Sequence, residues 1–314
     1  MDKDSIPTTR SIEPRPRILD YLFFLRPVLH PPVWTVVIMG YFRNHPGPAS
    51  ISRILLLLVV SSCAAGSAYV LNQISDIESD RINNKLFFLP RKIISIKSAY
   101  VIAITLILAT LLLGFSLGPL IGAMFVFGVA LGFAYSFRPV QGKNRPFIGT
   151  LVNGIAHGCL PFVAGNIASG GEMGTAALYS VPYMFAVIAV FVGTTIPDIP
   201  GDLKSGKITP GVALGIRKAA ALMAIALLAA IFFSVIFRDF PLLIASLTGS
   251  PFYLFALIKL TSKTIIVAVR MSILLLSLAA GLLFWPYLLV LLGLFAGTRA
   301  YYRLRFDITY PRFT

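Results

Sequence analysis

The chain has 314 residues, of which 57% are hydrophobic and 12% charged, and its mean hydropathy is +0.85. That much apolar side chain needs lipid as its solvent, so the composition excludes a soluble domain and predicts a protein that crosses the lipid bilayer several times. The net charge of +15 is spread between apolar runs, as in membrane proteins with basic cytoplasmic loops, and this argues against nucleic-acid binding.

The first 20 residues differ in composition from the rest. They contain three prolines and mixed charges, and no apolar core followed by a cleavage site, so they do not resemble a signal peptide. We expect residues 1–20 to form a flexible or interfacial cytoplasmic arm.

Apolar runs of about 20 residues predict an all-α fold, a bundle of nine transmembrane helices with a short tenth helix at the C-terminus. The transmembrane domain would span residues 21–285, and an extra helix with a basic tail would cover residues 286–314. The predicted helices cover residues 22–42, 54–74, 98–116, 118–137, 148–167, 176–196, 218–237, 241–259 and 266–284, and the tenth covers 286–301.

The basic residues indicate how the bundle is oriented. The loops of one side hold only Arg43, Arg53 and Arg238. The side with more cations should face the cytoplasm, so we expect a multi-pass protein of the cell (inner) membrane. Ten crossings would place the arginines of the C-terminal tail on the cytoplasmic side too, and we favour ten. The cytoplasmic side would carry 19 Lys and Arg residues, in the arm and in the loops at 75–97, 138–147, 197–218 and 259–270.

Two acidic stretches are the strongest functional signal. Asn72, Asp76 and Asp80 follow at four-residue spacing, which advances about 400° along an α-helix and places the three side chains close to one stripe. Asp198 and Asp202 repeat this spacing 122 residues later, on the same predicted side. Acids near a membrane core are costly and usually functional. One such acid could be a solvated loop charge, but the repeat favours two half-sites that face each other.

The acidic stretches suit a hard divalent ion. Paired carboxylates with an added amide oxygen are typical ligands of Mg²⁺, which often shares its coordination with substrate phosphates. Zinc is not expected, because His30, His45 and His157 are scattered over three segments. We expect His157 to be packed or to line a cavity.

Basic residues accompany both acidic stretches. The cations are Arg81, Lys85, Arg91 and Lys92 after the first stretch, Lys204 and Lys207 after the second, and Arg138, Lys143 and Arg145 in a third loop on the same side. Carboxylates that hold Mg²⁺ beside such cations would clamp a diphosphate and stabilise it as a leaving group, although each cation alone could equally be a topology signal. Because the site opens into a lipid-embedded bundle, the expected substrate is an allylic polyprenyl diphosphate whose tail lies between apolar helices.

Four stretches in this order resemble the UbiA superfamily of intramembrane prenyltransferases, over roughly residues 20–285. Each is a weak signal alone, and together they are specific. They are Arg26-Pro27, the N-x3-D-x3-D stretch from Asn72 followed by DRIN at 80–83, YSFRPVQGK at 135–143, and DIPGDLKSGKIT at 198–209 followed by Leu214-Gly215.

The resemblance implies a nine-helix bundle around a central cavity. It also implies transfer of the prenyl group to an acceptor, often an aromatic ring of the quinone-precursor kind, by electrophilic substitution. Arg26 and Tyr135 would lie near the acceptor or the reacting carbon. The Mg²⁺ and diphosphate residues implied are Asn72, Asp76, Asp80, Asp198 and Asp202, with Lys143, Lys204, Arg81 and Arg145 as cations near the diphosphate.

Two departures separate this chain from the family pattern. Many members carry an Arg where this chain has Phe87, so Arg81, Lys85 or Arg91 would take over its role, and this departure weakens the transfer of acceptor identity from quinone-pathway members. In the second acidic stretch, the position four residues before Asp198 is Thr194, so only two carboxylates remain there. Pro197 and Pro200 also each lack an N–H and crowd the preceding turn. We therefore expect a kinked end to the sixth helix.

Other functions remain as alternatives. An ion-coupled transporter could also use repeated acids, but transporter acids tend to lie near the bilayer midplane. A CDP-alcohol phosphotransferase is also multi-pass and Mg²⁺-dependent, but its D-x2-D-G-x2-A-R run does not occur in this sequence. Within the UbiA superfamily, a cyclase or an enzyme with a lipid or porphyrin acceptor stays open.

Overall fold

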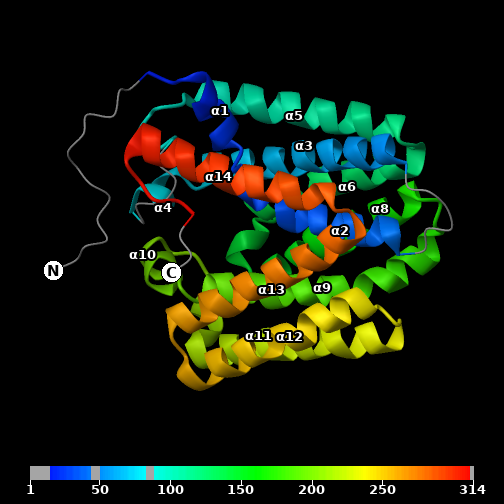
Figure 1. Cartoon of the computed structure of the whole chain (residues 1–314). Coiled ribbons are helices and arrows are strands. Elements are labelled where there is room, and N and C mark those ends of the chain that lie inside the picture. The colour runs from blue at the N-terminus through cyan, green and yellow to red at the C-terminus, as the bar shows by residue number, and fades with distance from the viewer. Residues whose placement is uncertain (1–14, 44–49, 83–87, 312–314) are drawn as a thin grey trace.

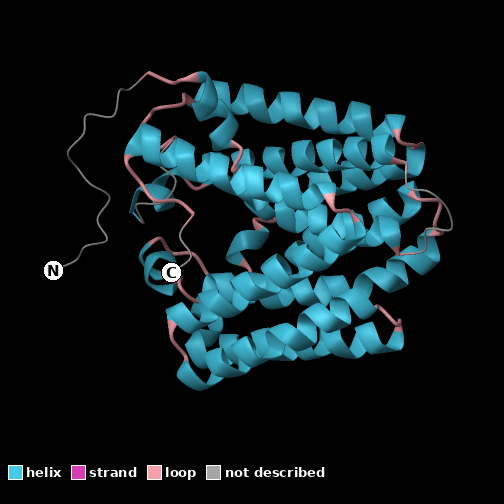
Figure 2. Ribbon diagram, in the orientation of Figure 1, coloured by secondary structure: helices cyan, strands magenta, loops and turns pink. Residues whose placement is uncertain are grey.

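The computed structural model describes residues 15–43, 50–82 and 88–311, which form helices joined by loops, with no β-strand among them (Figure 2). The helices are α1 (Ile18–Phe24), the 3-10 turn η1 (Pro27–Leu29), α2 (Pro31–Phe42), α3 (Ile51–Ser75), α4 (Ile77–Ile82), α5 (Ile96–Ser116), α6 (Pro119–Ser136), the 3-10 turn η2 (Gly142–Asn144), α7 (Pro146–Asn153), the π-helical turn η3 (Gly154–Cys159), α8 (Leu160–Ala168), α9 (Met173–Thr195), α10 (Ile199–Lys204), α11 (Pro210–Ile236), α12 (Phe240–Lys259), α13 (Ser262–Leu283) and α14 (Pro286–Phe306).

The nine predicted core spans agree with the structure, whereas the favoured tenth crossing, α14, is not among the candidate spans. Within the described ranges, eight helices are long and apolar enough to cross a membrane, and the pair Ile18–Leu29 and Pro31–Phe42 adds a ninth if it forms one span. The all-α, multi-pass prediction is therefore confirmed. The first span, expected as one helix over residues 22–42, is bent by 55° between its two parts. Pro27 and Pro31 explain the bend, because each lacks an N–H and crowds the preceding turn.

Two groups of helices are joined through α2 and α8 (Figure 1). In one group α3 packs against α5, and α5 against α6; in the other, α9 packs against α11, α11 against α12, and α12 against α13. Between them α2 and α8 lie so close that a Cβ added to Gly40 would come within 2.0 Å of the Phe162 carbonyl oxygen. Small residues at such contacts let helix backbones approach closely inside a membrane.

The π-helical turn η3 lies just before Pro161. In an α-helix a proline ring clashes with the carbonyl four residues earlier, here that of His157, and a wider turn accommodates this clash. The turn also presses against α9, because a Cβ on Gly158 would come within 2.7 Å of the Met184 Cα. Asn153 and His157 consequently line the interior cavities described below.

Helix α14 runs beyond its predicted end at residue 301 and is fixed at both ends. Near its start, the Tyr287 hydroxyl lies 2.7 Å from Thr35 Oγ1 on α2. Near its end, Tyr301 donates a hydrogen bond of 2.6 Å to Asp20 and stacks on Phe23, with ring centroids 3.7 Å apart. The end of α14 lies beside α1, at the same end of the bundle as α4 and α10 (Figure 1).

The N-terminal arm expected over residues 1–20 ends earlier than predicted. Residues 1–14 lie outside the described ranges, but α1 begins at Ile18 and Asp20 is fully buried. Arg305 on α14 donates to Asp20 through two nitrogens, each 3.2 Å from a carboxylate oxygen. Residues 18–20 therefore belong to the bundle. The sequence does not reveal the contact between Asp20 and Arg305, because Asp20 lies in a segment of mixed charge and its partner is far away in the sequence.

Candidate active site

The first acidic stretch lies where α3 ends. Asp76 has φ −110° and ψ 9°, which interrupts the helix between Ser75 and Ile77, so the predicted single stripe is broken. The Asp80 N–H still donates to the Asp76 carbonyl at 2.8 Å, and both Asp side chains are buried. Asn72, one turn earlier, lines a cavity, and its Oδ1 is buried with no hydrogen-bond partner within the described ranges.

Two lysines from other parts of the chain bind the Asp76 carboxylate. Lys143, on η2, lies 2.5 Å from Oδ1 and also donates to Ser75 Oγ at 2.7 Å. Lys207, in the loop after α10, donates to Oδ2 at 2.9 Å. The Lys143 and Asp76 side chains are only 7% and 9% exposed, so solvent ions screen this pair little. Asp76 therefore connects the two halves of the site.

The second acidic stretch lies between α9 and α10, and the kink predicted at the end of the sixth helix is confirmed. Helix α9 ends at Thr195, Asp198 precedes the first residue of α10, and Asp202 is buried within α10. Thr209 donates to Asp202 Oδ2 at 3.0 Å. Helices α4 and α10 contact each other, so both acidic stretches meet at one end of the bundle (Figure 1).

The cations predicted around the site occupy different places. Lys143 contacts Asp76, whereas Lys204, Arg81 and Arg145 have exposed side chains. Both Lys204 and Lys207 follow the second acidic stretch, and the family resemblance favoured Lys204 as the cation near the diphosphate; in the structure Lys207 reaches Asp76 instead. Phe87, the position of the family's missing Arg, and Lys85, one of its expected substitutes, lie outside the described residues, and the other two substitutes, Arg81 and Arg91, have exposed side chains.

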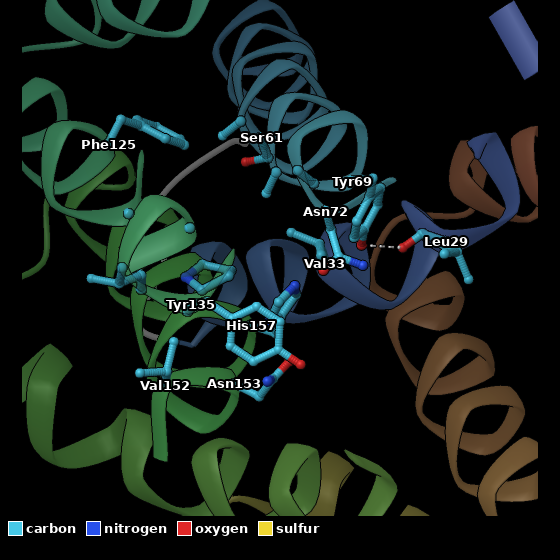
Figure 3. A pocket seen from close by; sticks show the side chains of 18 of the residues that line it. Leu29, Val33, Ser61, Tyr69, Asn72, Phe125, Tyr135, Val152, Asn153 and His157 are labelled. Atoms are coloured by element: carbon cyan, nitrogen blue, oxygen red, sulfur yellow. Dashed lines mark hydrogen bonds between the residues drawn. The ribbon is translucent and has the colours of Figure 1, made fainter. Parts of the chain in front are cut away.

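A cavity of about 380 Å³ extends into the bundle from the acidic end, between α3, α6 and the segment from α7 to α8. The side chains of Tyr69, Asn72, Tyr135, Asn153 and His157 surround this space (Figure 3). Many of its other lining residues are Ala and Gly, and Arg26 lies at its margin. His157 thus lines a cavity, as expected from the sequence.

A second cavity, of about 290 Å³, lies among α2, α9, α12 and α13. It shares Leu29, Tyr69, Asn153 and His157 with the first, so the two cavities meet at the π-helical turn. Both cavities are mostly apolar, and they lie below the acidic end of the bundle, which we call the mouth of the site. Together they can hold a lipid tail and part of a second molecule.

The donors at the mouth suit Mg²⁺ that is bound together with a phosphate group. Among the residues that the structure describes, no three His, Cys, Asp or Glu side chains are grouped so that they could hold a metal ion. Mg²⁺ is usually bound by one or two carboxylates plus substrate phosphates rather than by an all-protein cage. The four aspartates and the unpaired Asn72 Oδ1 are hard oxygen donors of this kind.

The UbiA prenyltransferase family model matches residues 33–271. The chain belongs to this family. A solved UbiA homologue from Archaeoglobus fulgidus, bound to GPP and Mg²⁺, has a TM-score of 0.67 and 18% sequence identity over 87% of this chain and 99% of its own. This likeness shows a shared fold.

Relatives within the UbiA family differ in their named products. The bacteriochlorophyll synthase 34 kDa chain of Chloroflexus aurantiacus is 28% identical over 162 residues, covering 50% of this chain and 51% of its own. A digeranylgeranylglyceryl phosphate synthase of Thermococcus gammatolerans is 34% identical over 173 residues, covering 53% of this chain and 58% of its own. The chain thus spans about half the length of the curated relatives it matches.

Proposed function

We propose that this protein is an Mg²⁺-dependent membrane prenyltransferase. It transfers a polyprenyl group from an allylic prenyl diphosphate to a second molecule and releases diphosphate. The observation that carries the proposal is the Asp76 carboxylate, which is held by Lys143 and Lys207 from both halves of the bundle at the mouth of an apolar cavity. The solved UbiA homologue bound to GPP and Mg²⁺ supports the same substrate class.

The residues at the mouth would hold the diphosphate of the substrate. When bound, Mg²⁺ neutralises phosphate charge and makes diphosphate a better leaving group. Asn72, Asp76, Asp80, Asp198 and Asp202 would hold it there. Lys143 and Lys207 lie where their ammonium groups can turn from Asp76 to phosphate oxygens.

The cavity below the mouth would enclose the allylic carbon during the reaction. The allylic C–O bond breaks and its electron pair leaves with the diphosphate, while the allylic carbon forms a bond to the acceptor, which loses a proton. The apolar walls keep water away from the allylic carbon, and the faces of Tyr69 and Tyr135 can stabilise positive charge there. The second cavity gives room for the rest of a substrate.

The acceptor that we propose is aromatic, of the quinone-precursor kind. A relative from Oryza sativa named as a probable homogentisate phytyltransferase and the digeranylgeranylglyceryl phosphate synthase of Thermococcus gammatolerans support a lipophilic or aromatic acceptor in general. The charge asymmetry of the loops supports a site that faces the cytoplasm from the cell membrane. Labelling of a Lys204→Cys variant by an impermeant maleimide, from one side of sealed vesicles, tests this orientation.

The experiment that tests the activity uses purified protein, labelled geranyl and geranylgeranyl diphosphate, and a panel of aromatic acceptors. We expect Mg²⁺-dependent release of diphosphate, abolished by Asp76→Asn and by Asp202→Asn. Glu78→Gln is the matched control, because it removes an acid of the same stretch whose side chain is 78% exposed. Ion flux in proteoliposomes without diphosphate release would support the transporter alternative. Full activity in both Asp variants would refute the assignment.

A further inference from the structure

His157 is a basic side chain at the junction of the two cavities, and the mechanism proposed above does not use it. It lies on the π-helical turn η3, and its Nδ1 is buried without a hydrogen-bond partner among the described residues. The ring keeps some exposed surface because it lines both cavities inside the bundle (Figure 3). An imidazole that faces an interior cavity is placed to accept a proton from a bound molecule.

The turn that carries His157 is fixed in place. A Cβ on Gly154 would come within 2.9 Å of the Ile188 and Met184 side chains, and Gly158 packs against the backbone of α9 in the same way. Single π-helical turns within α-helices are frequent at functional sites. A basic group on such a tightly packed turn keeps its position when a substrate binds.

Polar side chains connect the mouth with His157. The Tyr135 side chain lies within electrostatic reach of the Asp76 and Asp202 carboxylates. It also shares a hydrogen bond with the Asn153 side chain. Asn153 precedes His157 by about one helical turn, and its backbone carbonyl acts on the imidazole ring. His157 therefore lies beyond the diphosphate site, on the path that leads from the mouth into both cavities.

The surroundings of His157 favour a neutral imidazole with one nitrogen available. A backbone carbonyl such as that of Asn153 can only accept a hydrogen bond, so it suits the N–H of the ring. A neutral imidazole has one N–H and one nitrogen with a lone pair. Whichever nitrogen carries the hydrogen, the other one can accept a proton.

The other residues at the junction are not bases. The residues that line both cavities are Leu29, Val33, Tyr69, Asn153, His157 and Thr194. Tyr69 donates its hydroxyl hydrogen to the Leu29 carbonyl at 3.0 Å, and Thr194 donates to a carbonyl of its own helix at 2.7 Å. The amide of Asn153 does not accept a proton near neutral pH. His157 is therefore the base of this set.

We propose that His157 is a catalytic base that accepts the hydroxyl proton of a phenolic second substrate. This inference rests on the proposed prenyl transfer and names the acceptor as a phenol. The hydroxyl proton passes to the imidazole, and the oxygen then supplies electron density to the ring. A ring carbon forms the bond to the allylic carbon, while the allylic C–O bond breaks and its electron pair leaves with the diphosphate. The hydrogen of the attacked ring carbon moves to the oxygen and restores the phenol, and the imidazolium passes its proton to water as the products leave.

The first test needs no turnover. The purified full chain in detergent, with a heavy nitrogen isotope in its histidine rings, is titrated by NMR with para-cresol and with its methyl ether. Para-cresol should shift the ring nitrogen signals of His157, whereas the ether, which has no hydroxyl hydrogen to donate, should leave them unchanged. Equal shifts with both probes, or no shift with para-cresol, would overturn the proposal. His157→Gln assigns these signals by their absence, and if it does not fold, His30→Gln and His45→Gln assign them by elimination.

The second test separates the two steps of the reaction. Without an acceptor, geranyl diphosphate with a heavy isotope in its bridging oxygen should scramble this label as fast in His157→Gln as in the unmodified protein, because cleavage of the C–O bond does not need the base. Product formation from the phenols of the acceptor panel should fall at least roughly 100-fold in this variant, as expected for the loss of a general base. His30→Gln is the matched control, since His30 is a buried histidine that donates to or accepts from the chain at Leu25 and lines neither cavity. A full rate of product formation in His157→Gln would overturn the role of the base.

Chemical rescue distinguishes the base from a packing role. His157→Ala should regain product formation when imidazole is added, and pyrazole, a ring of the same size but a much weaker base, should not restore it. Equal recovery with the two rings would show that only their shape matters and would overturn the proposal. Absence of label scrambling in the unmodified protein would refute the prenyl transfer, whereas the NMR titration would still decide whether His157 receives a phenol.

Scrambling without product from any phenol would refute the base and leave the cleavage of the prenyl diphosphate intact.

Discussion

Replacement of Lys207 by Met should separate two lysines that the sequence does not distinguish. Lys207 donates to Asp76 Oδ2 at 2.9 Å, whereas Lys204, three residues earlier, is exposed on α10. Met keeps most of the apolar stem and removes the ammonium group. Lys204→Met makes the same chemical change at a position directed to solvent, and it is therefore the control.

The size of the effect follows from the contact that is lost. A hydrogen bond to a charged group contributes about 1.5–3 kcal/mol. If the Lys207 ammonium group turns to the departing diphosphate, its loss removes this amount from the transition state, and kcat/KM should fall by roughly 10- to 150-fold. The Lys207 side chain is 18% exposed, so water can replace part of the contact, and we expect the lower half of this range.

The assay is Mg²⁺-dependent release of diphosphate from a labelled prenyl diphosphate at several substrate concentrations. Lys207→Met should lower kcat/KM with little change in thermal stability, and Lys204→Met should behave as the unmodified protein. An equal loss in both variants would mean that general positive charge at α10, and not the contact with Asp76, assists the diphosphate. A full rate in Lys207→Met would refute the role given to this lysine.

Two further predictions concern stability and metal binding. Arg305→Gln should destabilise the protein in detergent by about 3 kcal/mol, because it leaves the fully buried Asp20 carboxylate without its cation; thermal unfolding would show this, and exposed Arg303→Gln should have no such effect. Titration calorimetry should detect Mg²⁺ binding that is much tighter with inorganic diphosphate than without it, because both oxygens of Asp76 are bound to lysines in the free site. Equally tight binding without diphosphate would contradict this arrangement.

Features repeated along the chain were predictable from the sequence. Apolar runs near 20 residues predicted the spans closely, since a helix that crosses lipid must satisfy its own backbone and show an apolar surface. The repeated Asp spacing predicted that two acidic stretches lie on one side, and α4 and α10 do lie in contact. Both features are local patterns: the membrane imposes the apolar runs, and the Asp spacing stands out because acids near a membrane core are costly.

Predicting that Lys207 contacts Asp76 requires the geometry of the turn after α10. Gly206 has φ +68° and donates to the Leu203 carbonyl, while the Lys207 N–H donates to the Asp202 carbonyl at 2.9 Å. These two bonds close the helix with a glycine in the left-handed region, and they turn the next residue back toward the site. The Ser205-Gly206-Lys207 sequence carries this signal, but the family resemblance pointed to Lys204.

Other features depend on contacts between distant segments and leave no local signal. No proline or glycine marks the break at Asp76, where Lys143 and Lys207 bind the carboxylate from 67 and 131 residues away. The predicted helix over residues 266–284 contains Arg270, although the charge count grouped this residue with the loop cations Lys259 and Lys263. Because α13 begins at Ser262, Arg270 lies deeper in the helix than the predicted start at residue 266 implies.

The ion pairs of Asp76 also explain how the mouth can stay ordered before a substrate arrives. Four carboxylates at one end of the bundle would repel each other if no cation lay among them, and Lys143 and Lys207 reduce that repulsion at Asp76. Both lysines lose a buried partner when a metal ion takes Asp76 alone, which is unfavourable. They find new partners at once when phosphate oxygens enter together with the metal ion. Under the proposed function, the same two lysines would thus make the site select Mg²⁺ and diphosphate as one unit, and this selection would keep metal ions from accumulating in a site that has no substrate.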